Sequence, residues 1–278
     1  MKRILALILC LLLLPCSALG ELTIYFIDVG QGDSALIVCD GDSMIIDGGI
    51  PGSKVYSFIK DHNITRLEYM VATHPDEDHV GGLAGVLNAV PVETIFSPVK
   101  DWNTKAFGDF KKYAEKQGAP ISVPYVGDEF YLGGATFTIL SCDASAKKPN
   151  EMTICLRLDY GETSFLFTGD IEGYALYQLT SLNVPLKSTV LKVSHHGSES
   201  SNPEDFLNLV NPEYAVISCG KNSYGHPAEA TLKLLKNHDV NLFRTDLQGT
   251  ITCVSDGRTI DFKTEHKAQS DLFTAPTK

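Results

Sequence analysis

Short hydrophobic runs separated by polar turns make up most of the chain from Glu21 onward. Runs rich in β-branched and aromatic residues predict strands. Three of them open the chain: "LTIYFID" (22–28), "SALIVC" (34–39) and "SMIID" (43–47). The next segment, "KVYSFIKDHN", places Val55, Phe58 and Ile59 at helical spacing, which predicts a helix. A predicted buried strand, "LEYMVAT" (67–73), and a predicted helix, "LAGVLNAV", follow it.

The second half of the chain repeats this alternation without repeating the sequence. The segments 152–160 and 163–170 predict a hairpin around Gly161, and a helix is expected over 172–181. A strand that ends in a histidine pair is predicted over 188–198. The remaining predicted elements are a strand at 213–220, a helix at 228–238 and a closing hairpin of 250–257 with 258–263.

These patterns predict one α/β domain. Each half of the chain is rich in strands and carries its own helices, and no linker of distinct composition separates the halves. Two sheets packed face to face, with helices on the outside, satisfy this order of elements. We therefore predict a four-layer αββα sandwich over residues 21–263. The polar residues 264–278 are predicted to form a flexible tail.

The first twenty residues, "MKRILALILCLLLLPCSALG", predict a signal peptide. Lys2 and Arg3 precede an apolar run at 4–14, and small residues stand before Glu21, as at a cleavage site. Cleavage near Gly20 predicts an extracytoplasmic protein without a membrane span in its mature form. An uncleaved membrane anchor is the alternative. No later segment is apolar and long enough to cross a bilayer.

Composition and charge exclude several classes of protein. With 44% hydrophobic and 21% charged residues, the 278-residue chain has the composition of a globular protein. Cleavage would remove two of the 23 basic residues and none of the 34 acidic ones, so the formal net charge would go from −11 to −13. Such a surface repels polyanions, and no stable nucleic-acid complex is expected. The five cysteines after residue 20 form no Cys-x-x-Cys pair, which argues against a zinc ribbon.

The stretch "THPDEDHVGG" (73–82) indicates a metal site. It places His74, Asp76, Asp78 and His79 in one turn directly after a predicted buried strand. A turn on such a rigid support can direct these side chains to one point. Imidazole nitrogens together with carboxylate oxygens suit zinc, manganese or iron. A solvated acidic turn with two incidental histidines is the alternative, and the spacing of the histidine pair favours metal ligation over it.

This stretch resembles the motif HxHxDH of the metallo-β-lactamase fold superfamily, with Asp76 in place of the second histidine. Together with it, five further segments of the chain occur in the order found in the extracytoplasmic metallo-hydrolase domain of ComEC-like DNA-uptake proteins. They are "IDVGQGDS", "IIDGG", "FLFTGD", "VSHHGS" and "SYGHP". The resemblance covers nearly the whole chain after residue 20.

The resemblance implies two adjacent divalent metal ions, Zn²⁺ or Mn²⁺. His74 and Asp76 would hold the first ion, and Asp78 and His79 the second. Asp170, at the end of "FLFTGD", matches the carboxylate that bridges the two ions, and a carboxylate between two cations is well placed to do so. An N-cap of the helix that follows is its alternative role.

The resemblance is incomplete at one ligand position. Asn150 stands where the family usually has a histidine. Because an amide is a poor zinc ligand, the first site is expected to bind metal weakly. His195 and His196 are expected to end a strand, so that one side chain faces the site and the other supports it. We favour His195 as the ligand. His226 could be a ligand, a proton donor or a phosphate contact, with a plain loop histidine as the alternative.

The segment "DVGQGDS" is predicted to be a tight turn between the first two strands. No helix and no Lys-Ser/Thr follow its glycines, which excludes a P-loop. Asp28, Gln31 and Asp33 are expected near the rim of the metal site. Asp47, in "IIDGG", resembles a family position that supports the metal ligands from behind.

Together these features predict hydrolysis by metal-activated water, with Asp78 orienting the water and His226 as a catalytic candidate. An exported phosphodiesterase or nuclease is favoured, because ComEC-like domains are thought to degrade the non-transported DNA strand. Hydrolysis of a lactone, a small phosphoester or a cell-wall ester is a second possibility, which the acidic net charge supports. A metal-binding module without turnover is the third, supported by the missing histidine.

Overall fold

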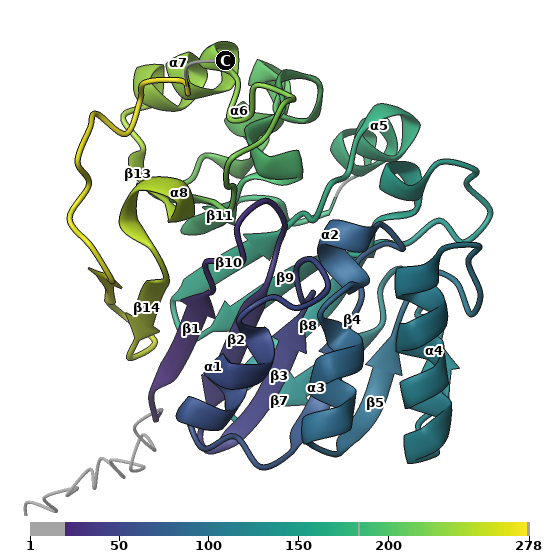
Figure 1. The fold of residues 1–278 in the computed structure, drawn as a ribbon. Coiled ribbons are helices and arrows are strands. Elements are labelled where there is room, and N and C mark those ends of the chain that lie inside the picture. Colours follow the sequence, from purple (N-terminus) through teal and green to yellow (C-terminus); the bar gives the residue numbers. More distant parts are fainter. Residues whose placement is uncertain (1–19, 183, 277–278) are drawn as a thin grey trace, which may run out of the picture.

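Two β-sheets packed face to face form the centre of the protein (Figure 1). The computed structural model describes residues 20–182 and 184–276. The predicted signal peptide lies outside the described residues except for Gly20.

The first sheet has eight strands in the order β15–β14–β1–β2–β3–β4–β5–β6. Neighbours are antiparallel from β15 to β3 and parallel from β3 to β6. The strands are β1 (Leu22–Phe26), β2 (Ala35–Cys39), β3 (Asp42–Ile46), β4 (Leu67–Val71), β5 (Val92–Phe96), β6 (Ile121–Ser122), β14 (Ile251–Ser255) and β15 (Ile260–Thr264).

The second sheet has seven strands in the order β13–β12–β11–β10–β9–β8–β7. Here the strands from β7 to β10 are antiparallel, and those from β10 to β13 are parallel. Each sheet thus has a parallel half, whose strands end at a common edge. The strands are β7 (Glu129–Leu132), β8 (Ala135–Ser141), β9 (Cys155–Tyr160), β10 (Thr163–Phe167), β11 (Val190–Lys192), β12 (Tyr214–Ile217) and β13 (Asn241–Arg244).

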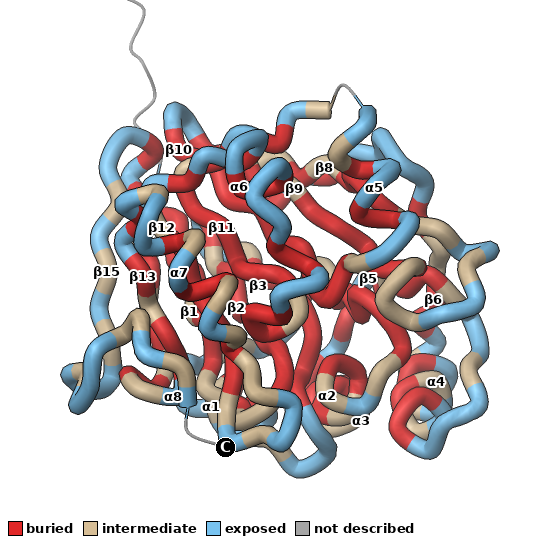
Figure 2. The backbone as a smooth tube through the Cα atoms, turned by 90° about the horizontal axis from the view of Figure 1, so that it is seen from above, coloured by how far each residue is buried: buried red, intermediate tan, exposed pale blue. Residues whose placement is uncertain are grey.

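Helices cover the outer face of each sheet, which confirms the predicted four-layer αββα sandwich. Phe26, Phe137 and Phe167 belong to the core between the sheets. Two further cores lie between each sheet and its helices, and Figure 2 shows the buried strands inside a more exposed periphery. The longer helices are α1 (Val55–Asp61), α3 (Leu83–Ala89), α4 (Lys105–Gln117), α5 (Gly173–Ser181), α6 (Glu204–Val210) and α7 (Glu229–Asn237).

Short helical turns connect several strands to the site. They are α2 (Glu77–Val80), α8 (Thr245–Gln248) and three 3₁₀ turns, η1 (Pro149–Met152), η2 (Ser194–Gly197) and η3 (Glu199–Ser201). Of these, α2 and η2 directly follow β4 and β11 along the chain. They carry the histidine motifs that the sequence singled out.

Most elements that the pattern predicted are present. The hairpin around Gly161 is confirmed as antiparallel β9 and β10, and the helix expected over 172–181 is α5. The strand predicted over 188–198 is wrong in its second half, because β11 ends at Lys192. His195 and His196 instead lie in η2 with left-handed φ angles of 48° and 54°. Four strands and the helix α4 between residues 91 and 141 had no prediction.

The described chain contains neither a disulfide nor a membrane-spanning helix. Cys39, Cys142, Cys155, Cys219 and Cys253 are free thiols, four of them buried, as expected for small apolar residues. None of the helices in the described part of the chain has the length and hydropathy that crossing a bilayer requires.

The segment predicted as a flexible tail is partly held against the domain. Leu272, Phe273 and Ala275 pack against the core beneath α5, α6 and α7. The buried Arg244 donates hydrogen bonds to the carbonyl oxygens of Leu272 (2.9 Å) and Thr274 (2.7 Å). The prediction of a loose tail is therefore wrong for these residues, because a buried guanidinium needs acceptors that the tail backbone supplies.

We predict that Arg244→Met lowers the free energy of unfolding by about 3–5 kcal/mol, since it breaks a buried ion pair and leaves its acceptors unpaired. The guanidinium also forms a bidentate pair with Asp246 at 3.0 and 2.7 Å. Denaturant unfolding measures the change. The control is Arg66→Met at an exposed ion-pair site, where a loss below about 1 kcal/mol is expected. Equal losses in the two variants would contradict the role of Arg244.

Candidate metal centre

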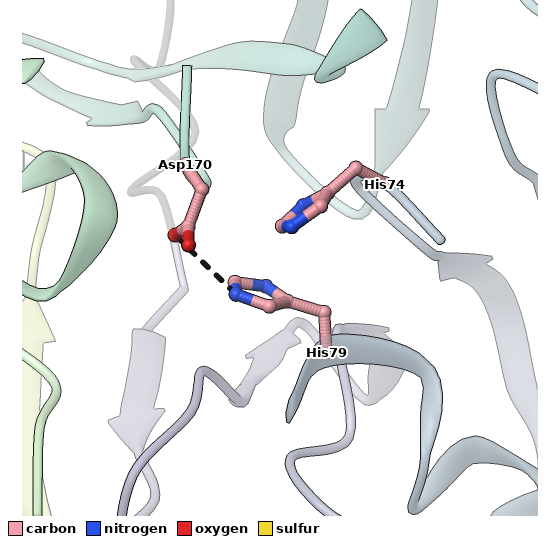
Figure 3. A group of neighbouring side chains, drawn as sticks. All are labelled: His74, His79 and Asp170. Carbon is pink, nitrogen blue, oxygen red and sulfur yellow. Dashed lines mark ion pairs between the residues drawn. The ribbon is translucent and has the colours of Figure 1, made fainter. Parts of the chain in front are cut away.

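Polar side chains from both sheets converge where the parallel strands end. Asp47 follows β3, and His74 follows β4, on the first sheet. Asp170 follows β10, and His196 follows β11, on the second. The side chains of His74, His79 and Asp170 point toward one another, as Figure 3 shows. All four loops therefore contribute to one site at the edge of the two-sheet core.

The imidazole of His74 presents a free lone pair to this site. Its Nδ1 lies 3.1 Å from the hydroxyl oxygen of Thr73, and that hydroxyl donates its only proton to Asp47 Oδ2 at 2.7 Å. The Thr73 oxygen must therefore accept the Nδ1 proton of His74, which leaves Nε2 unprotonated. Burial, helped by the nearby His79, lowers the pKa of His74 to about 3. The ring is neutral at pH 7.

His79 is anchored in the same way. Its Nδ1 lies 2.8 Å from Asp47 Oδ2, and a carboxylate oxygen can only accept. Nδ1 therefore carries the proton, and Nε2 faces Asp170 Oδ1 at 3.3 Å, along the dashed line of Figure 3. Burial alone would lower the pKa of His79, but the charges of Asp170 and Asp47 raise it well above its ordinary value.

His196 is the third imidazole with this arrangement. Its Nδ1 donates to the carbonyl oxygen of Ser218 at 2.9 Å. Its Nε2 lies 3.2 Å from Asp78 Oδ2 and 3.5 Å from Asp170 Oδ2. Burial opposes the charged ring, but Asp170 and the contacts with the carboxylates of Asp33 and Asp78 raise the pKa of His196 to about 10. The protonated, positively charged form of the His196 ring is thus strongly favoured.

These donors fit divalent cations. His74 Nε2, His79 Nε2 and Asp170 Oδ1 are buried without a hydrogen-bond partner, which is costly for polar atoms. One donor atom from each of these residues lies within 4.8 Å of the others, and Asp78, His79 and His196 form a second such group. Nitrogen and carboxylate donors at this spacing are what zinc or manganese would need.

A buried ion pair stands behind His196. Lys192 Nζ contacts Asp33 Oδ2 at 2.7 Å, and Asp33 Oδ1 lies 3.3 Å from His196 Nδ1. Burial would raise the pKa of Asp33, but Lys192 and His196 bring it to about 2. Lys192 comes from the second sheet and Asp33 from the β1–β2 turn of the first. The pair therefore joins the sheets beside the centre.

The geometry favours His196 over His195 as the ligand, against the sequence-based preference. His195 lies at the rim and belongs to none of the candidate metal groups among the described residues. Its Nδ1 faces Glu172 Oε2 at 3.4 Å, and its Nε2 is 3.7 Å from Asp170. Strand alternation cannot separate the two histidines, because neither lies in a strand.

Asn150 and Asp76 also lie at the rim. Asn150 donates to Glu172 Oε1 at 3.1 Å. Asp76 Oδ2 is 3.7 Å from His74 Nε2, and its side chain is 41% exposed. Burial and the neighbouring Asp78 raise the pKa of Asp76 to about 6. Asp76 is therefore near the first donor group but outside it.

The residues of the β1–β2 turn differ in whether they contact the candidate ligands. Gln31 Oε1 accepts a hydrogen bond from the backbone of Gly220 at 3.3 Å. Asp28 accepts from Gly30 at 3.1 Å and pairs with Lys54 at 3.8 Å. None of the contacts described for Asp28 involves the candidate ligands, unlike those of Asp33, so the expectation that Asp28 supports the metal rim is not met.

His226 stands at the mouth of the site. Its ring lies 5.2 Å from that of His195. Burial, together with His195 and His196, lowers the pKa of His226 to about 4. Its imidazole is neutral at pH 7, which disfavours the proton-donor role and fits a hydrogen-bonding role better. The N-cap alternative for Asp170 is not supported either, because Glu172 occupies the N-cap position of α5.

Several residues of the site had no prediction from the sequence: Thr73, Glu172, Lys192 and Asn222. Lys192 had a usable signal, since it is a single cation inside the apolar run "VLKV". A lysine buried in such a strand needs a buried anion, and the motif aspartates were the candidates. Thr73 and Glu172 become visible only through hydrogen-bond geometry.

Known proteins of similar sequence identify the family of this chain. The sequence model of the metallo-beta-lactamase superfamily matches residues 27–221. The chain is 31% identical over 264 residues to ComE operon protein 3 of Bacillus subtilis (strain 168), which covers 87% of this chain and 34% of that protein. It is 31% identical over 232 residues to Competence protein ComA of Neisseria gonorrhoeae, and this match covers 81% of this chain and 31% of that protein. The chain thus spans about a third of the length of these relatives.

A solved structure supports the fold independently. The metallo-beta-lactamase fold protein YhfI from Bacillus subtilis aligns with a TM-score of 0.59 at 12% identity. The alignment covers 85% of this chain and all of that one. With a family match over most of its length, this chain belongs to the metallo-beta-lactamase superfamily and resembles the ComEC family within it.

Proposed function

We propose that this chain is an exported, metal-dependent hydrolase that cleaves phosphodiesters. One observation carries the proposal: three buried imidazoles are each anchored through Nδ1 and direct Nε2 toward shared carboxylates. The anchors are the Thr73 hydroxyl, Asp47 and the Ser218 carbonyl oxygen, for His74, His79 and His196 respectively. A solvated acidic turn would not need such anchors. Export rests on the apolar N-terminal segment alone.

The residues would divide between two divalent cations, as the resemblance to the family implies. By that resemblance His74 would serve one cation, Asp78, His79 and His196 the other, and Asp170 both. Asp76, 3.7 Å from His74 Nε2 at the rim, would have to move inward to join His74. Divalent cations at such positions supply Lewis acidity: they acidify water and withdraw charge from a phosphoryl oxygen. Asn150 is occupied by Glu172, so the first cation has fewer protein ligands. We infer that this cation binds more weakly than the second.

The chain's own side chains orient the attacking water and contact the substrate. Asp78 is 31% exposed, whereas Asp170 is buried, so water enters beside Asp78. Its carboxylate accepts a hydrogen bond from that water and turns the oxygen toward phosphorus. A new P–O bond then forms as the water loses a proton by way of the Asp78 carboxylate to solvent, the ester P–O bond breaks, and solvent supplies the proton that the leaving oxygen takes up. His226, as a neutral ring at the mouth, donates a hydrogen bond to a phosphoryl oxygen.

Two features of the chain bear on the choice of substrate. Resemblance to the ComEC family favours DNA, whereas the net charge of −11 disfavours any stable complex with a polyanion. A small phosphodiester has the same linkage as DNA but is not a polyanion. The local positive field of the cations would therefore be enough to bind it. The acidic surface also supports a second candidate function, hydrolysis of a lactone, another small ester or a cell-wall ester. A metal-binding module without turnover is the non-catalytic alternative.

We predict that the full chain, loaded with Mn²⁺ or Zn²⁺, hydrolyses bis(p-nitrophenyl) phosphate. Asp78→Ala and His79→Ala should each lower kcat/KM by about 100-fold or more, because each removes a cation ligand worth several kcal/mol of transition-state stabilisation. The matched control is His266→Ala, at an exposed histidine, which should retain activity. Parallel assays with single-stranded DNA, double-stranded DNA and lactones identify the substrate class. Metal uptake without turnover on any of them would favour the binding module.

Metal binding should release protons at neutral pH. The pKa of His79 and that of His196 are both raised, so in protein stripped of metal these rings carry a proton that a cation must displace. The apparent affinity should fall by about tenfold per pH unit and per displaced proton on acidification. Titration calorimetry in buffers of different ionisation enthalpy counts these protons. An affinity for Mn²⁺ that is constant from pH 8 to pH 6 would contradict the ligand assignment.

Asp47→Asn should weaken metal binding by about 10–100-fold without unfolding the protein. Asp47 accepts hydrogen bonds from the Thr73 backbone, the Thr73 hydroxyl and His79 Nδ1, so it orients both histidines of the motif, and such supporting carboxylates have effects of this size. Equilibrium titration with Mn²⁺ measures the loss. The control, Asp61→Asn at an exposed position, should bind as the unaltered chain does.

A further inference from the structure

The loop 220–228 brings His226 to the mouth of the site without regular secondary structure. The His226 ring does not anchor itself, since its Nδ1 is buried without a hydrogen-bond partner. The position of the ring therefore depends on the backbone that carries it. Whatever fixes this backbone also fixes the distance of His226 from the substrate.

One side chain, that of Asn222, makes five hydrogen bonds within this loop. Its Nδ2 donates to the carbonyl oxygens of Gly220 (2.8 Å) and His226 (2.7 Å). Its Oδ1 accepts from the backbone N–H groups of Tyr224 (3.1 Å), Gly225 (2.9 Å) and His226 (3.1 Å). Asn222 thus holds both the N–H and the C=O of His226, and it replaces the backbone pairing that the loop lacks.

The two ends of the loop are fixed to the centre itself. At the entrance, the Gly220 N–H donates to Gln31 at 3.3 Å. At the exit, Ala228 donates to the carbonyl oxygen of Gly197, the residue after His196, at 3.0 Å. A Cβ at Gly197 would lie 2.6 Å from Pro227 Cβ, so the loop packs closely against this residue. Because both ends of the loop are held, only the backbone conformation between them is left free, and Asn222 determines that conformation.

We propose that Asn222 is a positioning residue that sets the His226 imidazole against the phosphoryl oxygen of the substrate. This inference rests on the proposed function and deepens it. The task requires an amide, because two donors and one acceptor with three bonds must come from one short side chain. Aspartate has the same shape but no donor, and its charge would face the carbonyl oxygens of Gly220 and His226.

The test uses the full chain with Mn²⁺ and bis(p-nitrophenyl) phosphate, in a double-mutant cycle. Asn222→Asp and Asn222→Ala should each lower kcat/KM by about 10–100-fold, the size expected when a reacting group is displaced by about 1 Å. His226→Ala should have a comparable effect. Asn222→Ala combined with His226→Ala should be no worse than His226→Ala alone, because the first change acts only through the second residue. Mn²⁺ affinity should stay unchanged in all of them.

Amide hydrogen exchange gives a readout that does not depend on turnover. In Asn222→Ala, the amides of Tyr224, Gly225 and His226 should exchange faster, while those of β12 keep their protection. The matched control is Asn241→Ala, at an exposed asparagine with a single backbone contact, which should change neither exchange in the loop nor kcat/KM.

Three results would separate the possible failures. Losses of activity that multiply in the double variant would show that Asn222 does not act through His226 and would overturn the inference. Unchanged amide exchange in Asn222→Ala would also overturn it. Absence of turnover by the unaltered chain on every phosphodiester would instead refute the proposed function. In that case the exchange experiment still decides whether Asn222 shapes the loop.

Discussion

The carboxylate of Asp170 is buried among imidazoles, and the arrangement of the whole centre depends on how its charge is compensated. An isolated ionised carboxylate at such a position would cost many kcal/mol. Nitrogens of His79 and His196 approach it at 3.3 and 3.5 Å, and their charges, working against burial, hold the pKa of Asp170 well below its ordinary value. Each of these rings is turned toward Asp170 by a hydrogen bond at its far nitrogen. The anchors at Asp47 and Ser218 are thus as necessary as the ligands.

The same constraint explains why the site lies between two sheets. The first sheet supplies Asp47, His74 and His79, and the second supplies Asp170 and His196. Packing the sheets brings buried charges of both signs together, among them Asp170 and His196. The Lys192–Asp33 pair, at 2.7 Å, balances one more anion across the same interface. The donors of the candidate cation site therefore come together only when both sheets have packed, since neither sheet alone carries a complete set.

Sequence patterns were sufficient to predict the αββα sandwich and most of the buried donors of the site. Hydrophobic patterns located β1 to β4, β9 to β12 and the closing hairpin of β14 and β15, and the short motifs after some of these strands supplied His74, His79 and Asp170. The choice between His195 and His196 failed for a physical reason. Period-two alternation applies only to extended backbone, whereas both residues have left-handed φ angles in η2. Asn222 lay one residue outside the "SYGHP" motif, and its role depends on five hydrogen bonds that no spacing rule encodes. The segment 91–141 lacked chemical motifs, and its strands and helix therefore drew no prediction.

At the rim of the centre lies Asn150, at the position where the resemblance to the family implies a histidine. Asn150 binds one oxygen of Glu172, and the other oxygen of Glu172 faces His195, which in turn lies 3.7 Å from Asp170. This chain of contacts connects position 150 to the shared carboxylate without making it a ligand. The amide of Asn150 is a hydrogen-bond donor to one oxygen of Glu172, and the other oxygen stays available to His195. Position 150 thus lies at the rim of the site and contacts Glu172 rather than the candidate ligands.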